Sequence, residues 1–405
     1  MNKVIFLNFP THGCINPLLA TASELVERGE KIIYYCTEEF RNKIEQTGAE
    51  FRPYKGLINE YKIKNYEDLF EGLKLIVEMT VDKLDYNLDT IRKENPDYII
   101  HDSLCTWGKL IASILGIPAI NLMHSYPITK SSISFSAYTV PFLLKIGLYT
   151  LINHFNKNSF KNTLKKKYDI NLSIGDILMN KEGLNIVYTS KQMELSVYQS
   201  ENTYRFVGPS LFFKNEQNGF PYHKLRNKSV IYISLGTLHS KNSDFYKICL
   251  KAFSNTKYYI VISVGFKTNL DEFDNIPDNF LIRQSVPQQK LLEYVDLFIT
   301  HAGMNSVNEA ICRGVPMLMF PHHFEQEMIA RRVTEMGVGK KMNIKNITTE
   351  KLYNNAHHVI SESHFKNQAL KFKSVFTGEE KVSHIKAADE ILHYIKNDFK
   401  KNRRE

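Results

Sequence analysis

Residues 285–326 read SVPQQKLLEYVDLFITHAGMNSVNEAICRGVPMLMFPHHFEQ. Two runs in this segment, Val295–Thr300 and Val315–Phe320, are short and apolar, as in buried strands, and a helical pattern lies between them. Strand, helix and strand in this order predict a parallel βαβ unit. Similar runs lie upstream at Ser229–Leu235, Tyr258–Val264 and Phe280–Arg283. The carboxyl half therefore predicts an α/β domain with a parallel sheet.

The amino half carries its own strand and helix patterns. Lys3–Phe9 and Lys31–Cys36 are strand-like runs, and Pro17–Arg28 between them has the apolar spacing of a helix. Asn16 is suited to cap this helix, and Gly29 is suited to the left-handed residue past its end. Two further strands are predicted at Asp97–Asp102 and Ala119–Met123. A second parallel α/β domain is expected here.

The segment 207–228 separates the two halves. Gly, Pro, Asn and Lys replace the apolar periodicity in it, so we place a linker there. The predicted domains are residues 1–206 and residues 229–405, the second ending in carboxyl-terminal helices. A length of 405 residues fits two domains.

Composition excludes several classes of protein. The net charge of +9 is mild for this length and forms no aromatic-interleaved basic stripe, so no nucleic-acid partner is expected. Five scattered cysteines without a CxxC pair predict neither a disulfide framework nor a structural zinc site. No GxGxxG, GxxxxGK[ST] or HExxH motif occurs, which argues against nicotinamide enzymes, P-loop kinases and zinc proteases.

No targeting or membrane-spanning segment is predicted. The first apolar run stops at Pro10, too early for a signal peptide, and the apolar stretches 110–123 and 137–152 are interrupted by prolines and polar residues. We expect a cytoplasmic protein.

Ligands of parallel α/β sheets bind outside the carboxyl ends of the strands. Three loops in such positions are candidates: 10–17, 101–103 and 285–326. In the last of these, the chain turns at His301 and Gly303 and then begins a helix. Backbone N–H groups and the helix dipole would converge there on an anion such as a pyrophosphate.

The elements VPQ, HxGxNSxxEA, GVP and a closing acidic-Gln pair in 285–326 resemble the nucleotide-sugar signature of family 1 glycosyltransferases. PTHGCINPLLA near the start, FVGPS in the middle and ISLGT after it are similar to the bacterial macrolide and flavonoid branch. The resemblance covers nearly the whole chain. It implies the GT-B fold, two Rossmann-like domains facing a central cleft, with the acceptor on the amino half and the nucleotide-sugar on the carboxyl half.

The resemblance also assigns donor-binding roles. His301 would donate to a phosphate oxygen, Gly303 would let the backbone approach, and Glu309 would accept from ribose hydroxyls. Further donor contacts would come from Gly236 and Thr237 (phosphate), Asn305 and Ser306 (phosphate), Val286 and Gln288 (base and ribose), and Glu325 and Gln326 (hexose hydroxyls). The alternatives are an ordinary strand-end turn for SLGT and simple helix-start chemistry for Glu325.

The donor is expected to be a UDP-sugar, UDP-glucose in particular. Plant relatives usually have Trp at the position of Ser285, and its indole stacks on uracil. Ser285 cannot stack, and stacking is worth about 1–3 kcal/mol at other nucleobase sites. The base pocket is therefore expected to tolerate other nucleotides.

Catalysis in this family inverts the anomeric carbon and uses a histidine oriented by an aspartate to take the acceptor proton. Asp102 matches the aspartate, but Cys14 stands at the position of the histidine. His12 lies two residues earlier, and in an extended loop it would face the same side as Cys14. A loop histidine without a task and Cys14 itself as the base are the alternatives. No metal ion or other cofactor is expected, because His301 and the helix start would neutralise the leaving diphosphate.

Three functions compete. The first is a glycosyltransferase acting on a lipophilic small molecule such as a macrolide or a phenol. The second acts on a lipid at a membrane surface, with residues 137–152 and Lys165–Lys167 as a weak docking patch. The third is an accessory protein that binds the nucleotide-sugar but has lost catalysis with its histidine.

Overall fold

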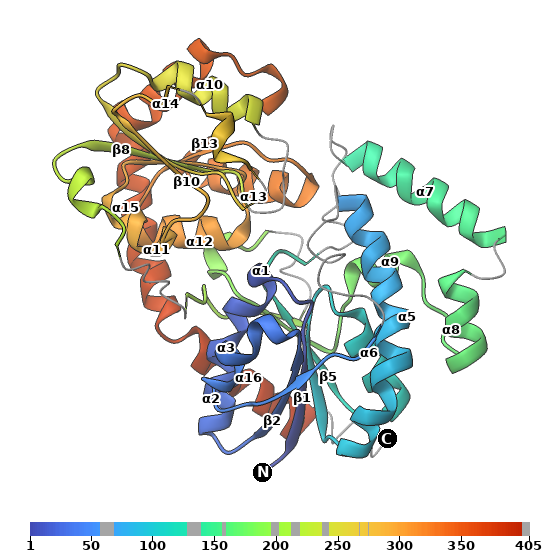
Figure 1. The fold of residues 1–405 in the computed structure, drawn as a ribbon. Coiled ribbons are helices and arrows are strands. Elements are labelled where there is room, and N and C mark those ends of the chain that lie inside the picture. The colour runs from blue at the N-terminus through green and yellow to red at the C-terminus, as the bar shows by residue number, and fades with distance from the viewer. Residues whose placement is uncertain are drawn as a thin grey trace. The chain divides into compact units, whose positions relative to one another are not determined.

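The computed structural model describes residues 1–56, 69–127, 139–155, 159–195, 202–211, 219–236, 243–266, 268–273 and 275–398. The chain divides into two compact units, Met1–Phe212 with Glu379–Glu405, and Phe213–Gly378. Each unit holds one parallel sheet flanked by helices (Figure 1), which confirms the predicted fold class of two Rossmann-like α/β domains.

The sheet of the first unit has the strand order β3-β2-β1-β4-β5-β6-β7. All its pairings are parallel; Ile5, for example, lies between Ile33 and Ile99. Its strands are β1 (Lys3–Leu7), β2 (Lys31–Cys36), β3 (Glu50–Pro53), β4 (Tyr98–Asp102), β5 (Ala119–Met123), β6 (Leu184–Val187) and β7 (Tyr204–Phe206). The four strands predicted in this half are therefore present.

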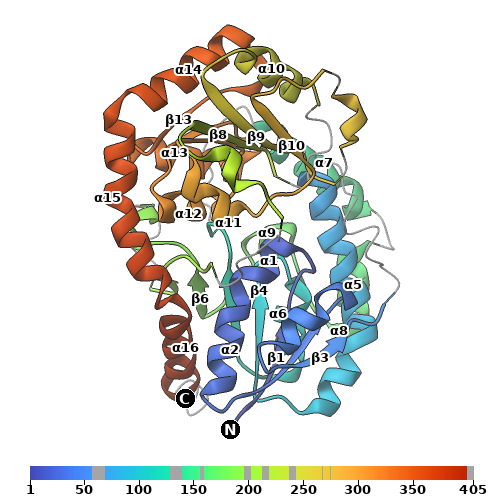
Figure 2. The same cartoon turned by 60° about the vertical axis from the view of Figure 1, so that its left-hand side comes forward.

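Helices cover both faces of this sheet. In Figures 1 and 2, α2 (Leu19–Glu27) and α16 (Ser383–His393) lie on one side, and α5 (Leu69–Glu94) and α6 (Thr106–Leu115) lie on the other. The single tryptophan of the chain, Trp107 in α6, is fully buried. The other helices are α3 (Arg41–Glu45), α7 (Thr139–Phe155), α8 (Phe160–Tyr168) and α9 (Ile174–Met179).

The first helical segment begins earlier than predicted. Thr11 is the last extended residue, and α1 (His12–Ile15) runs through the 3₁₀ turn η1 (Asn16–Leu18) into α2. Asn16 is therefore inside the helical segment and is not its cap; its side-chain oxygen accepts from Lys43 Nζ at 3.2 Å. Pro17 has no N–H to donate, and the chain passes this position as a 3₁₀ turn. Gly29 has φ +92°, as expected past the helix end.

The sheet of the second unit has the order β10-β9-β8-β11-β12-β13. Its strands are β8 (Ser229–Ser234), β9 (Tyr258–Ser263), β10 (Phe280–Arg283), β11 (Leu297–Thr300), β12 (Met317–Met319) and β13 (Gly339–Lys341). One face carries α10 (Ser243–Phe253) and α14 (Thr349–Ser361), and the other carries α11 (Gln288–Leu291), α12 (Met304–Arg313) and α13 (Phe324–Glu335). Ile231, Ile299 and Leu318 lie fully buried in its core.

The predicted domain boundaries need one correction. The chain leaves the second unit within α15 (Ser363–Glu380), and the residues from Glu379 onward belong to the first unit. There α16 packs on α2 (Figure 2), buries Ile391 completely, and places Asp389 Oδ1 2.5 Å from Arg28 Nη1. An amphipathic pattern shows that a helix is covered but does not show by which sheet, and for this reason the sequence alone predicts a single domain over 229–405. Part of the predicted linker, 212–218, lies outside the described residues.

Within the described ranges, every helix is too short or too polar to cross a bilayer.

Candidate functional site

Both sheets have a topological switch point at which ligands of such folds bind. The strand order reverses between β1 and β4 in the first unit and between β8 and β11 in the second. Cys14 follows β1, Asp102 ends β4, and Gly236 and His301 follow β8 and β11. These four of the sequence-predicted residues thus fall at the two switch points.

In the second unit, the His301 ring lies against two glycines. A Cβ atom on Gly236 would lie 3.0 Å from His301 Nε2, and a Cβ atom on Gly303 would lie 2.5 Å from the same atom. Gly236 also has φ +83°, which side chains disfavour. The structure therefore brings together three of the predicted phosphate residues, and a Cβ atom on either glycine would press against the His301 ring. Thr237 lies outside the described residues.

The turn from β11 into α12 is tightly constrained. Ala302 is buried with φ +65°, a conformation that costs roughly 1–2 kcal/mol for a residue with a Cβ atom. Gly303 is the N-cap of the ten-residue α12, without a side-chain cap. The first N–H groups of a helix have no partners within it. Asn305 and Ser306 are half-buried in this first turn. The arrangement offers backbone donors and a positive dipole end to an anion.

A hydrogen-bond network connects α11 with α12. Gln288 accepts from Tyr232 Oη at 2.8 Å and donates to Glu309 Oε2 at 2.5 Å and to Ser306 Oγ at 3.3 Å. Gln289 donates to the other Glu309 oxygen at 3.2 Å. Burial raises the pKa of Glu309, while the two amides and the Arg313 charge oppose this. The predicted Gln288 and Glu309 are therefore in contact.

Sequence reasoning missed two members of this network, Gln289 and Tyr232. Gln289 directly follows Gln288 in VPQQ, which was the available signal; Tyr232 is an ordinary strand residue and carries none. Val286, the remaining residue of the predicted base pocket, is buried, and its carbonyl accepts from Gln288 N–H at 2.8 Å.

Glu325 and Gln326 lie in the first turn of α13. Gln326 is buried, and its side-chain oxygen accepts from the His322 N–H at 2.8 Å, which holds the preceding Pro-His-His loop. Glu325 is half-buried. The two predicted sugar contacts are thus adjacent, and one of them also positions its own loop.

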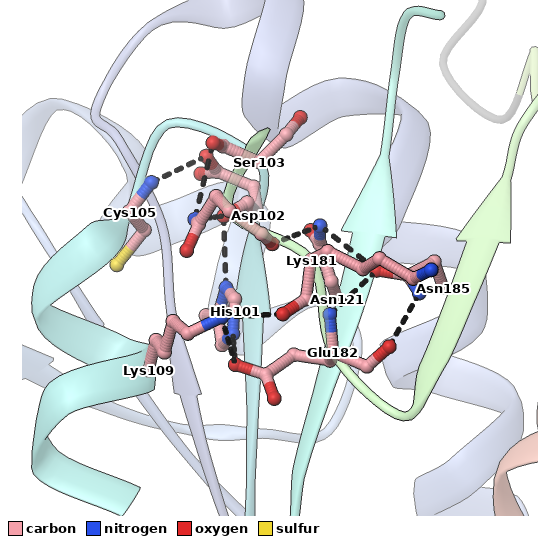
Figure 3. A network of polar contacts seen from close by, with 10 residues as sticks. His101, Asp102, Ser103, Cys105, Lys109, Asn121, Lys181, Glu182 and Asn185 are labelled. Atoms are coloured by element: carbon pink, nitrogen blue, oxygen red, sulfur yellow. Dashed lines mark hydrogen bonds and ion pairs between the residues drawn. The ribbon is translucent and has the colours of Figure 1, made fainter. Parts of the chain in front are cut away.

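In the first unit, the Asp102 carboxylate is fully buried at the end of β4 (Figure 3). One oxygen accepts from Phe9 N at 2.5 Å and Asn8 Nδ2 at 2.9 Å. The other accepts from Leu104 N at 2.7 Å and Cys105 N at 3.1 Å. Burial raises the pKa of Asp102 to about 6, although these donors act to lower it. The adjacent His101 ring contacts the Asp102 carbonyl oxygen, 2.9 Å from Nδ1, and Glu182, 3.2 Å from Nε2, and it does not contact the carboxylate.

His12 does not take the place proposed for it. Residues 12–15 are helical, so residues i and i+2 point about 200° apart around the axis and do not share a side. The His12 side chain is 61% exposed, with Nε2 3.3 Å from Glu39 Oε1 and its ring edge-on to Phe40. Among the described contacts of Asp102 there is none with His12. The expectation of an extended loop was wrong, and with it the geometric argument for the pair.

Cys14 is buried, with 3% of its surface exposed. Its Sγ accepts from Thr11 Oγ1 at 3.1 Å and lies 3.5 Å from Nε2 of His124. His124 directly follows β5, the second strand from β1 in the sheet. Sequence reasoning missed His124, although the carboxyl-end rule that selected the other loops applies equally to a histidine that follows Ala119–Met123.

Comparison with known proteins identifies the family of the chain. Residues 223–384 match the family described as UDP-glucoronosyl and UDP-glucosyl transferase. NDP-glycosyltransferase YjiC of Bacillus subtilis is 32% identical over 392 residues, 95% of this chain and 96% of that protein. The chain belongs to the UDP-glycosyltransferase family. This glycosyltransferase is also 23% identical to oleandomycin glycosyltransferase of Streptomyces antibioticus, over 89% of its own length and 83% of the relative.

The fold of this glycosyltransferase is similar to a solved structure, the glycotransferase of kitacinnamycin. The TM-score is 0.81 at 20% identity, over 97% of this chain and 99% of the other. This likeness confirms the GT-B fold.

Proposed function

We propose that this glycosyltransferase transfers a hexose from UDP-glucose, with inversion, to a hydroxyl of a lipophilic small molecule such as a macrolide or a phenol. The proposal that the second unit binds the donor rests on one observation, the His301 ring between Gly236 and Gly303 at the start of α12. The named activity of the oleandomycin relative supports the acceptor class.

The chemistry at the donor site follows from its charges. A leaving diphosphate gains negative charge as the bond to the sugar breaks, and backbone N–H groups already aimed at it need no rearrangement. His301 adds a donor beside the helix start. We therefore expect transfer without a metal ion or another cofactor. Glu325 and Gln326 supply acceptors for the hexose hydroxyls, and the absence of an indole at Ser285 lets other nucleotides compete with UDP.

Calorimetric titration with UDP tests the donor site. His301→Ala removes a donor to the diphosphate, and Gly303→Ala pushes a Cβ atom into the His301 ring, so each should weaken UDP binding about 10–100-fold. Gly378→Ala is the matched control because no atom lies within 4 Å of its added Cβ. UDP affinity equal to wild type in His301→Ala would place the pyrophosphate elsewhere.

Transfer to a lipid at a membrane surface is the second candidate. It is favoured by one observation, the exposed apolar side chains of α7, among them Leu144 and Leu148, which are 69% and 60% exposed. An accessory protein without catalysis is disfavoured by membership of an enzyme family.

A further inference from the structure

The site in the first unit contains a thiol and an imidazole in contact. Cys14 comes from α1 and His124 from the residue after β5, so two separate segments of the sheet edge bring Sγ and Nε2 to 3.5 Å. The Thr11 hydroxyl donates to the same sulfur atom at 3.1 Å. Three residues from two loops therefore define the position of one sulfur atom.

We propose that Cys14 and His124 together take the proton from the acceptor hydroxyl. This inference rests on the proposed glycosyl transfer. Cys14 stands where the family has its base, and His12 is directed to Glu39. Asp102, which orients the base elsewhere in the family, is here engaged by four donors from its neighbouring loops. In the proposed pair, His124 takes over the role of orienting the base through its contact with Cys14 Sγ.

The proton of the acceptor hydroxyl passes to His124 by way of the Cys14 thiol. The acceptor oxygen attacks the anomeric carbon, and its proton passes to Cys14 Sγ while the thiol proton passes to His124 Nε2. The new C–O bond forms as the bond from the anomeric carbon to the diphosphate breaks, and that electron pair leaves with the nucleotide. The His124 imidazolium then returns its proton to water. Imidazole is suited to this because its ordinary pKa lies near 6.5.

Two measurements test the proposal. The first compares transfer to an aliphatic alcohol with transfer to 4-nitrophenol, which ionises unaided. In His124→Gln and Cys14→Ala, transfer to the alcohol should fall about 10²–10⁴-fold, with a much smaller loss for the phenol and unchanged UDP affinity. His393→Gln, on exposed α16 surface, is the matched control. Alcohol transfer that persists in His124→Gln but is lost in His12→Gln overturns the proposal.

The second measurement needs no acceptor. Reaction of the Cys14 thiol with methyl methanethiosulfonate forms a methyl disulfide and releases methanesulfinate. Followed by peptide mass spectrometry, this reaction should be at least tenfold faster at pH 7 in wild type than in His124→Gln, with buried Cys105 as the internal reference. Equal reaction rates of Cys14 in wild type and in His124→Gln would overturn the proposal that the two residues act as a pair, whether or not an acceptor is found. If wild type transfers to neither acceptor while the rates differ, the pair stands and the proposed function fails.

Discussion

Four donors surround the Asp102 carboxylate, yet burial holds its pKa at about 6, above the ordinary 3.8. The native state therefore binds a proton more readily than the unfolded chain between about pH 4 and pH 6. The contribution of Asp102 to the free energy of unfolding is fully present below pH 4 and is lost as the pH rises through 6. A difference of about two pKa units corresponds to roughly 3 kcal/mol.

The substitution Asp102→Asn makes this testable. An amide keeps only one acceptor oxygen for four donors, so the variant should be less stable than wild type at every pH. Its deficit should be larger at pH 4 than at pH 7, by up to about 3 kcal/mol, because only wild type loses stability through this titration. Urea unfolding at the two pH values measures the difference, with the exposed Asp97→Asn as control for charge removal. A deficit that grows toward pH 7 contradicts the raised pKa.

The sequence predicted which residues lie together in the second unit better than it did in the first. His301, Gly303 and Glu309 share one short segment whose spacing identifies them together, and Gly236 follows a recognisable strand. The contact between Cys14 and His124 joins residues 110 positions apart and leaves no local pattern. Most donors to Asp102 are backbone N–H groups, which no side-chain pattern marks. His12 was misplaced because its loop is helical.

Strands that lie in longer apolar runs of the sequence were predicted at the right places, whereas β3, β6, β7 and β13 were missed. β1, β4, β8 and β11 are continuous buried runs, whereas β7 and β13 have three residues each at sheet edges. A strand of three residues cannot show a period of two. The start of α1 was missed because Asn16 and Pro17 form a convincing start signal five residues too late, which a 3₁₀ turn absorbs.

The helix α7 distinguishes the two candidate acceptor classes. Its exposed leucines favour a membrane, but Lys165 and Lys167 of the predicted patch are paired with Asp169 and Asp85 at 2.6 and 2.5 Å. Paired lysines offer little attraction to anionic lipids. We expect wild type to remain in the supernatant when anionic phospholipid vesicles are sedimented.

Binding to the vesicles would contradict this prediction. Loss of that binding in the double variant Leu144→Glu and Leu148→Glu would then assign it to α7 and favour the lipid acceptor. Lys251→Glu, on a helix of the second unit, is the control for added negative charge.

The two units are not consecutive in sequence. The segment from Glu379 onward completes the first unit, and Ile391 of α16 is fully buried there. Sequence patterns predicted both sheets but did not predict this return of the chain, because the contact of α16 with α2 joins the two ends of the chain.

Trp107 reports on the first unit alone, since it is the single tryptophan and lies in α6. Ile391→Ala should lower the free energy of unfolding of the first unit by about 2–5 kcal/mol. The loss should be seen as a lower urea midpoint of Trp107 fluorescence, although the two residues are far apart in sequence. Ile385→Ala, on the partly exposed side of α16, should have a much smaller effect. An unchanged midpoint in Ile391→Ala would show that α16 does not stabilise the first unit.

The return of the chain at Glu379 also sets an order of events on the ribosome. At about 5–20 residues per second, roughly 10–30 s pass between synthesis of the first segment of unit one and synthesis of α16. During this time all residues of the second unit are synthesised, while the apolar surface of α2 is not yet covered by α16. An α16 from a neighbouring nascent chain fits that surface equally well, so crowded polysomes favour exchange of this helix between copies. The first unit, whose synthesis begins first, is therefore completed only after the second.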